Sequence, residues 1–230
     1  ESLITALKVG YKHIDCAVLY GNQNIVGQGI KEFLESNDDG ITRKDLFITS
    51  KLYNEDHNPK YVYQTTLKSI KDLECEYIDL LLIHWPLSWI KNIPFVRNRK
   101  VTILDTWKAM CNCVDKGYVK SIGVSNFDEY QLNHLLKVIK DNNLNILPVV
   151  NQIEIHPHFI NKNVVNYCFK NNITPVAWGP INNGKSLNND IFLNNIVKSS
   201  NYKFRNVYDL SLQWNMARNV VVIPSSNNPK

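Results

Sequence analysis

The chain has 230 residues, enough for one large α/β domain or two small ones, and 44% of them are hydrophobic. Its charged fraction of 20% and net charge of +5, with the lysines scattered, indicate a solvated surface rather than a nucleic-acid-binding one. No apolar run reaches the roughly 18 residues of a membrane span, and no secretory signal pattern opens the chain. We therefore expect a cytoplasmic protein without nucleic-acid or membrane partners.

The five cysteines support that expectation, because their number is odd and their spacing shows no pairing pattern. Reduced thiols of this kind are typical of cytoplasmic proteins. Cys111 and Cys113 stand two apart on a predicted helix, so they point to different faces and do not share a metal ion. No metal site is predicted.

Helices alternate with short apolar strands from one end of the chain to the other. Apolar spacing predicts helices over 2–9, 24–34, 59–73, 102–116, 129–140 and 162–170, with one or two more within 191–218. Apolar and β-branched runs predict strands over 11–17, 46–52, 77–85, 119–124, 149–155, 174–178 and 220–224. The two longest connections, 87–101 and 179–189, are predicted as loops.

This alternation predicts parallel strands joined by right-handed helical crossovers. A doubly wound open sheet is one possibility, but no glycine-rich phosphate-binding motif follows any of the strands. Polar residues end many strands, as in a (β/α)8 TIM barrel, where that end carries the function. We predict a single, incomplete (β/α)8-barrel domain over residues 1–230. Its seven predicted strands are one short of eight, so we expect the first strand to precede Glu1 and a helix and tail to follow Lys230.

The stretch YIDLLLIHWP, residues 77–86, is the clearest of these strands. Its apolar run ends in Pro86, which is typical of a fully buried strand of a parallel sheet. His84 stands at its carboxyl end, where α/β proteins keep their chemistry. Taken alone, such a residue is more often a core histidine with a satisfied hydrogen bond.

Other polar residues also stand at the ends of predicted strands, and together they favour a catalytic role for His84 over the core interpretation. Burying the charge of Asp15 or Lys51 alone in an apolar strand is costly, so we expect the two to pair. A buried ion pair without a function is the simpler interpretation. However, a lysine ammonium also favours the phenolate of a nearby phenol, which makes Tyr20 a candidate proton donor beside His84. The polar residues at predicted strand ends are Asp15, Tyr20, Lys51, His84, Ser125, Asn126, Asn151, Gln152, Ser225 and Ser226.

The chain resembles the aldo-keto reductase family, of the aldose and aldehyde reductase kind, along nearly its whole length. Each of its motifs is weak alone, but all stand in the family's order. They are GYKHIDCAVLYGN, ITSKL, LLLIHWP, KSIGVSNF, VVNQIEIHP, PVAWGP and VVVIPSS.

The resemblance implies reduction of an aldehyde or ketone with NADP(H) or NAD(H). Tyr20 would protonate the carbonyl oxygen, and Lys51, held by Asp15, would favour the Tyr20 phenolate. His84 would orient and polarise the carbonyl group. Proton donation of this kind typically gives about 10²–10⁴ in rate.

The resemblance also implies which residues hold the cofactor and line the substrate pocket. Trp178 would stack on the nicotinamide ring, unless it is simply a large residue at a strand end. Tyr53, His84 and Trp85 would line a pocket that favours apolar carbonyl compounds. The implied cofactor-binding residues are Asp15, Ser125, Asn126, Gln152, Trp178, Gly179, Ile181, Ser225 and Ser226.

Two positions depart from the family pattern. Ser225 stands where the family usually has a lysine for the 2′-phosphate of NADP, so the preference for NADP over NAD stays open, and Lys230 is a partial substitute. Tyr53 stands where many members have tryptophan. The full-length protein is expected to be a monomer.

Two other functions stay open at this point. The chain is also consistent with a cofactor-binding regulatory subunit, like the channel β-subunits of the same family, or with an inactive member of the fold. Cofactor binding without turnover distinguishes these from an enzyme.

Overall fold

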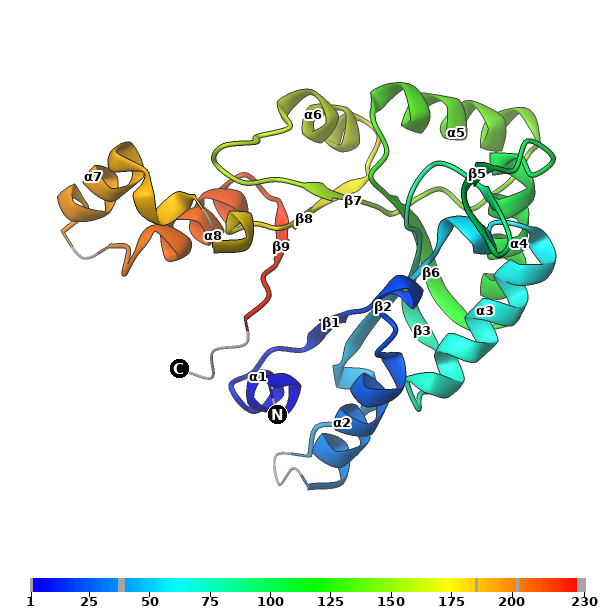
Figure 1. Ribbon diagram of the computed structural model, residues 1–230, viewed down its shortest axis with the longest axis horizontal. Helices are drawn as coiled ribbons and strands as arrows, with labels where there is room; N and C mark the ends of the chain where they lie inside the picture. Colours follow the sequence, from blue (N-terminus) through cyan, green and yellow to red (C-terminus); the bar gives the residue numbers. More distant parts are fainter. Residues whose placement is uncertain (1, 37–39, 185, 202, 227–230) are drawn as a thin grey trace. The chain divides into compact units, whose positions relative to one another are not determined.

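A computed structural model of the chain describes residues 2–36, 40–184, 186–201 and 203–226 (Figure 1). The chain forms two compact units, of which the first extends to Val149 and the second is Val150–Ser226. Nothing in the structure tests the prediction that residues 1–230 form one domain.

Unit 1 contains parallel strands in the order β1-β2-β3-β6, with helices between them (Figure 1). Helical 3₁₀ turns precede or follow the strands: η1 (Val18–Tyr20), η2 (Arg43–Asp45) and η3 (Asn54–Asp56). The strands are β1 (His13–Asp15), β2 (Phe47–Leu52), β3 (Ile78–Ile83) and β6 (Val119–Ser125). The helices are α1 (Ser2–Lys8), α2 (Gln23–Ser36), α3 (Pro59–Asp72), α4 (Ile103–Asp115) and α5 (Glu129–Asp141).

Helix starts in unit 1 follow from local sequence. Thr102 and Asp105 form a capping box at α4, in which each side chain binds the other residue's backbone amide. Asp128 and Gln131 do the same at α5. At α3, Pro59 occupies the first turn, where its missing N–H costs nothing.

The one charged residue inside the apolar run of β3 is paired. Asp79 accepts hydrogen bonds from Arg43 at 2.7 Å and from the Ile48 backbone amide at 2.9 Å. Residues Leu80 to Ile83 are then buried on both faces, as the unbroken apolar run predicts. The carboxyl end of β3 therefore lies in the buried core.

Unit 2 contains three parallel strands in the order β7-β8-β9. Its apolar core includes Ile153, Val165 and Ala177. The strands are β7 (Val150–Glu154), β8 (Thr174–Trp178) and β9 (Val221–Ile223). The helices are α6 (Lys162–Lys170), α7 (Ile191–Ser199) and α8 (Val207–Ala217), with 3₁₀ turns η4 (Asn182–Gly184) and η5 (Leu187–Asn189).

The parallel strands alternating with helices confirm the predicted α/β class, and two helices occupy 191–218. The prediction of an irregular loop over 87–101 was wrong. An antiparallel hairpin lies there, formed by β4 (Trp89–Ile90) and β5 (Ile93–Arg97). Its tight turn places Asn92 in the left-handed region, with φ of 62°. In the described part of the chain, no helix is long and apolar enough to cross a membrane.

Candidate active site

Lys51 is the centre of a polar cluster at the carboxyl ends of β1 and β2. Its side chain is fully buried, and its ammonium forms an ion pair with the Asp15 carboxylate. The same ammonium donates hydrogen bonds to the Cys16 carbonyl oxygen at 3.0 Å and to Tyr20 Oη at 3.2 Å. Three oxygen acceptors therefore surround the buried charge, which compensates the cost of removing it from water.

The register of two neighbouring strands brings these groups together. Asp15 lies opposite Thr49 in the β1–β2 pair, and the Cys16 amide continues the ladder to the Thr49 carbonyl at 2.9 Å. Lys51 lies two residues further along β2, with its side chain on the same side of the sheet as Thr49. The sequence alone predicted the pairing of Asp15 with Lys51, and the structure confirms this contact.

Tyr20 reaches the cluster from a turn rather than from a strand. It ends η1, and Gly21 follows in the left-handed conformation with φ of 65°. The Tyr20 side chain is 49% exposed, whereas Lys51 is inaccessible to solvent. The phenol is thus accessible from outside, whereas the cation that binds it is not.

His84 follows β3 directly and lies across from Tyr20, with ring centroids 6.0 Å apart in an edge-to-face arrangement. Its backbone amide binds the Leu52 carbonyl at 3.0 Å, which extends the sheet by one residue. Burial, and then the Lys51 ammonium, lower the pKa of His84 to about 4. The imidazole is therefore neutral at neutral pH, and its buried Nδ1 has no hydrogen-bond partner among the described residues.

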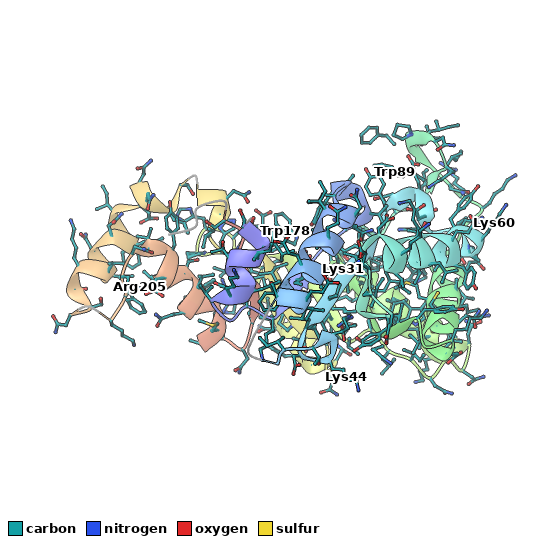
Figure 2. All side chains as sticks on the ribbon, turned by 90° about the horizontal axis from the view of Figure 1, so that it is seen from below. Lys31, Lys44, Lys60, Trp89, Trp178 and Arg205 are labelled. Atoms are coloured by element: carbon teal, nitrogen blue, oxygen red, sulfur yellow. The ribbon has the colours of Figure 1, made fainter. Side chains whose placement is uncertain are left out.

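Aromatic rings continue outward from His84 toward the hairpin. Tyr53 lies 6.3 Å from the His84 ring and 5.4 Å from the Trp89 ring, both between centroids. Trp89 in turn packs against Phe95 of β5 at 4.8 Å. Figure 2 labels Trp89 on the hairpin of unit 1. Trp85, the other expected pocket residue, is 44% exposed.

Trp89 was missed from the sequence because residues 87–101 were interpreted as a loop. Two apolar pairs, Trp89–Ile90 and Ile93–Pro94, flank Lys91-Asn92. Asparagine at such a turn, between apolar residues, is a recognised hairpin signal. The strongest form of that signal pairs asparagine with glycine, which is absent here, so the pattern alone did not identify the hairpin.

Ser125 ends β6, and Asn126 follows it beside His84. The Asn126 side-chain amide donates to the His84 carbonyl at 2.9 Å and to Ser125 Oγ at 3.2 Å. Asn126 has φ of 62°, a conformation that asparagine tolerates better than most residues. This amide therefore joins the ends of β3 and β6.

The remaining expected cofactor residues lie in unit 2. Gln152 is buried within β7, and Trp178 is the half-buried last residue of β8. Gly179 follows with φ of 60°, and Ile181 packs against the apolar cluster around Leu187. Ser225 and Ser226 are exposed beyond β9, and Lys230 lies outside the described residues. Figure 2 labels Trp178.

The structure therefore brings Asp15, Tyr20, Lys51 and His84 together within unit 1, with Ser125 and Asn126 adjoining them. A phenol held by a buried cation, opposite a neutral imidazole, is suited to giving a proton to an oxygen that gains negative charge. The expected residues of unit 2 are placed only within their own unit.

The sequence model of the Aldo/keto reductase family matches residues 1–230. The chain is 39% identical over 242 residues to aldose reductase C of Dictyostelium discoideum, covering 99% of this chain and 72% of that protein. It is 37% identical to glycerol 2-dehydrogenase (NADP(+)) of Hypocrea jecorina, covering 97% and 74%. It is 39% identical to glyoxal reductase of Bacillus subtilis (strain 168), covering 98% and 72%.

Proposed function

The chain belongs to the aldo/keto reductase family, and we propose that it reduces an aldehyde or ketone with a nicotinamide cofactor. Membership confirms the predicted (β/α)8-barrel fold class. The observation that carries the proposal is the 3.2 Å hydrogen bond from Lys51 to Tyr20 Oη, because it connects the exposed phenol to a buried cation.

In the proposed reaction, Tyr20 gives its proton to the carbonyl oxygen of the substrate. The Lys51 ammonium stabilises the phenolate that remains, and the Asp15 carboxylate keeps that ammonium in place. General acid assistance of this kind is worth about 10²–10⁴ in rate. Lys51 is too deeply buried to touch the substrate and acts through Tyr20.

His84 is proposed to orient the carbonyl group. Its lowered pKa of about 4 means that it does not compete with Tyr20 as the acid at neutral pH. A neutral imidazole offers an N–H to the carbonyl oxygen, and this donor strengthens as charge develops there. The two rings lie edge to face with their centroids 6.0 Å apart, so His84 is a neighbour of the proposed proton donor.

The proposed cofactor is NADP(H) or NAD(H), and residues at the strand ends of each unit have side chains of the types that bind a nicotinamide. Ser125, Asn126 and Gln152 supply the hydroxyl and amide groups that recognise a carboxamide. Trp178 supplies an aromatic face for stacking. When bound, the cofactor supplies the hydride for the carbonyl carbon. Other proposed contacts are Asp15, Gly179, Ile181, Ser225 and Ser226.

The relatives support a small carbonyl compound as the substrate class. Their names refer to aldose, glycerol with NADP(+), and glyoxal. Tyr53, Trp85 and His84 are proposed to line the substrate pocket, and the aromatic walls favour an apolar substituent on the carbonyl. The name of one relative includes NADP(+), which supports NADP as the cofactor. Ser225, however, has no positive charge with which to bind the 2′-phosphate of NADP.

The test is to measure binding and oxidation of NADPH and NADH with an aromatic aldehyde. We expect turnover in the unchanged chain and a loss of about 10²–10⁴ in kcat for Tyr20→Phe, with cofactor affinity retained. Tyr11→Phe is the matched control, because Tyr11 is also about half exposed but lies outside the cluster. Equal rates in Tyr20→Phe and the unchanged chain would refute the assigned proton donor.

A further inference from the structure

The hairpin of β4 and β5 is attached to the 3₁₀ turn η3, which follows β2. At one end of this contact, the Asn54 side-chain amide donates a hydrogen bond to the Leu87 carbonyl oxygen at 2.8 Å. At the other end, the Glu55 carboxylate accepts one from the Asn92 backbone amide at 3.1 Å. Asn92 lies in the turn between the two strands, so η3 binds both the approach to the hairpin and its tip.

The last residue of η3 forms an ion pair with the hairpin. Lys91 Nζ lies 2.6 Å from Asp56 Oδ1. The Asp56 side chain is 4% exposed, whereas that of Lys91 is 38% exposed. Lys91 Nζ also lies 5.4 Å from the centre of the Tyr61 ring on α3. A carboxylate buried this deeply is costly without a cation, so Asp56 favours the position of the hairpin in which Lys91 reaches it.

The hairpin itself is not part of the buried core. Its strands pair only with each other in the described part of the chain. All five residues of β5 are exposed, and Phe95 is 82% exposed. An isolated two-stranded hairpin is only marginally stable in water. We therefore infer that the contacts with η3 decide where this hairpin lies.

The position of the hairpin matters because it carries Trp89, which Figure 2 labels. The Trp89 ring packs edge to face on Tyr53, and the Tyr53 ring lies 6.3 Å from that of His84 between centroids. Tyr53 directly precedes η3, and Trp89 is two residues before Lys91. The ion pair and the aromatic pair thus belong to one contact between the same two segments. Displacing the hairpin from Asp56 would also take the Trp89 ring away from Tyr53.

We propose that Asp56 is a positioning residue for substrate selection. By holding Lys91, it fixes the hairpin so that the Trp89 ring forms a wall of the substrate pocket next to Tyr53. An aromatic aldehyde has a ring to pack on this wall, whereas glyoxal has none. Asp56 is almost completely buried and acts through the hairpin. This inference rests on the proposed reduction of carbonyl compounds.

The kinetic experiment compares Asp56→Asn with the unchanged chain. Asparagine keeps the shape of the side chain but removes the charge that attracts Lys91. KM for an aromatic aldehyde should rise roughly two- to tenfold, which corresponds to a lost aromatic contact, with kcat and KM for glyoxal little changed.

Variants of Lys91 test the same pair from the other side. Lys91→Arg keeps a cation for Asp56 and should leave KM for the aromatic aldehyde unchanged. Lys91→Met should raise it as Asp56→Asn does. The double variant Asp56→Asn/Lys91→Met leaves no buried charge unpaired, so it replaces Lys91→Met where that single variant does not fold. Circular dichroism and thermal melting verify the fold of each variant.

A second measurement does not depend on activity. Arg97 ends β5 and Arg99 follows it, so trypsin cleavage after these two residues reports how firmly the hairpin is held. This cleavage, mapped by mass spectrometry, should be faster in Asp56→Asn than in the unchanged chain. Asp72→Asn is the matched control, because Asp72 also pairs with a lysine, Lys68, but outside the hairpin. Its KM values and its cleavage should equal those of the unchanged chain.

The two measurements together separate the outcomes. Unchanged cleavage and unchanged KM in Asp56→Asn overturn the proposal. Faster cleavage with an unchanged ratio of KM for the two aldehydes also overturns it, because the ion pair then serves stability alone. Absence of turnover in the unchanged chain refutes the proposed reductase activity and, with it, the role in substrate selection. The cleavage rates then still show whether Asp56 holds the hairpin.

Discussion

Lys51 donates a hydrogen bond to Tyr20 Oη across 3.2 Å, from a side chain that is itself inaccessible to solvent. The buried cation and the half-exposed phenol thus form one unit, with the charge inside and the transferable proton outside. The Asp15 carboxylate balances that charge. The proposed proton donor and the buried ion pair that stabilises the fold are therefore coupled at this point.

The first prediction concerns that coupling. Lys51→Met should lower the free energy of unfolding by about 3–5 kcal/mol, because it leaves the Asp15 carboxylate without its cation. Asp15→Asn combined with Lys51→Met should be less destabilising than the sum of the two single changes. Urea denaturation of the three variants measures both quantities.

Lys68→Met is the control for the ion pair. Lys68 pairs with Asp72 on the surface of α3, where the lysine side chain is 73% exposed. Its removal should cost less than about 1 kcal/mol. Strictly additive losses in the Asp15 and Lys51 variants would contradict the coupling.

The second prediction concerns pH. The pKa values of His57 and His84 are lowered from 6.5 to about 4 by burial, so folding favours their neutral forms. Between these values the unfolded chain binds more protons than the folded chain. Stability should therefore be complete above about pH 6.5 and fall as the pH decreases toward 4. Urea denaturation across this range measures the slope.

The double variant His57→Gln/His84→Gln should flatten the slope, whereas His134→Gln replaces an exposed imidazole and serves as its control. Carboxyl groups affect the free energy of unfolding at lower pH than these histidines do. Hydrogen bonds from Thr42 and Thr102 lower the pKa values of Asp45 and Asp105 below 3.8. A profile that is equally steep in the double variant would show that other groups cause the loss of stability.

The third prediction concerns the hairpin and depends on the proposed activity. Trp89→Ala removes the ring that packs on Tyr53 at 5.4 Å. If a substrate ring also packs on Trp89, that aromatic pair is worth about 0.5–1.5 kcal/mol, so KM for an aromatic aldehyde should rise roughly two- to tenfold when it is lost. KM for glyoxal, which has no ring, should change little.

Steady-state kinetics with both aldehydes measure this difference. Phe192→Ala is the control, because Phe192 is 71% exposed and belongs to unit 2. An equal change of KM for both substrates in Trp89→Ala would indicate a general loss of structure rather than a lost pocket wall.

The fourth prediction concerns the close contact of α2 with the end of α3. A Cβ atom at Gly27 would stand 2.3 Å from the Asp72 carbonyl oxygen and 2.7 Å from the Leu73 carbonyl carbon. Both are backbone atoms, so Gly27→Ala forces the helices apart and should cost about 1–3 kcal/mol. Thermal or urea denaturation measures the loss.

Gly29→Ala in the same helix is the matched control. Its Cβ would meet the flexible end of Leu3 at 3.1 Å, which can move aside. Alanine also has a better helix propensity than glycine, by about 1 kcal/mol. Stability should be unchanged or raised, and an equal loss at both positions would show that backbone contact is not the cause.

Most elements were predictable because each has a local cause. Capping residues such as Thr102 and Asp128 mark helix starts, and the apolar run before His84 marks a buried strand. The hairpin at Trp89 was not predicted, since its two short strands are exposed in part and lack a continuous apolar face. Its strands are held largely by pairing with each other.

The sequence by itself determined the class of fold and which residue types stand at the strand ends. It also indicated that Asp15 and Lys51 pair, because neither charge is stable alone in an apolar strand. Only the tertiary structure decided that the Cys16 carbonyl completes the shell around the ammonium, and that Trp89 lies beside Tyr53. Those contacts join residues that are distant in the chain. Their positions depend on strand register and burial, which no local sequence pattern encodes.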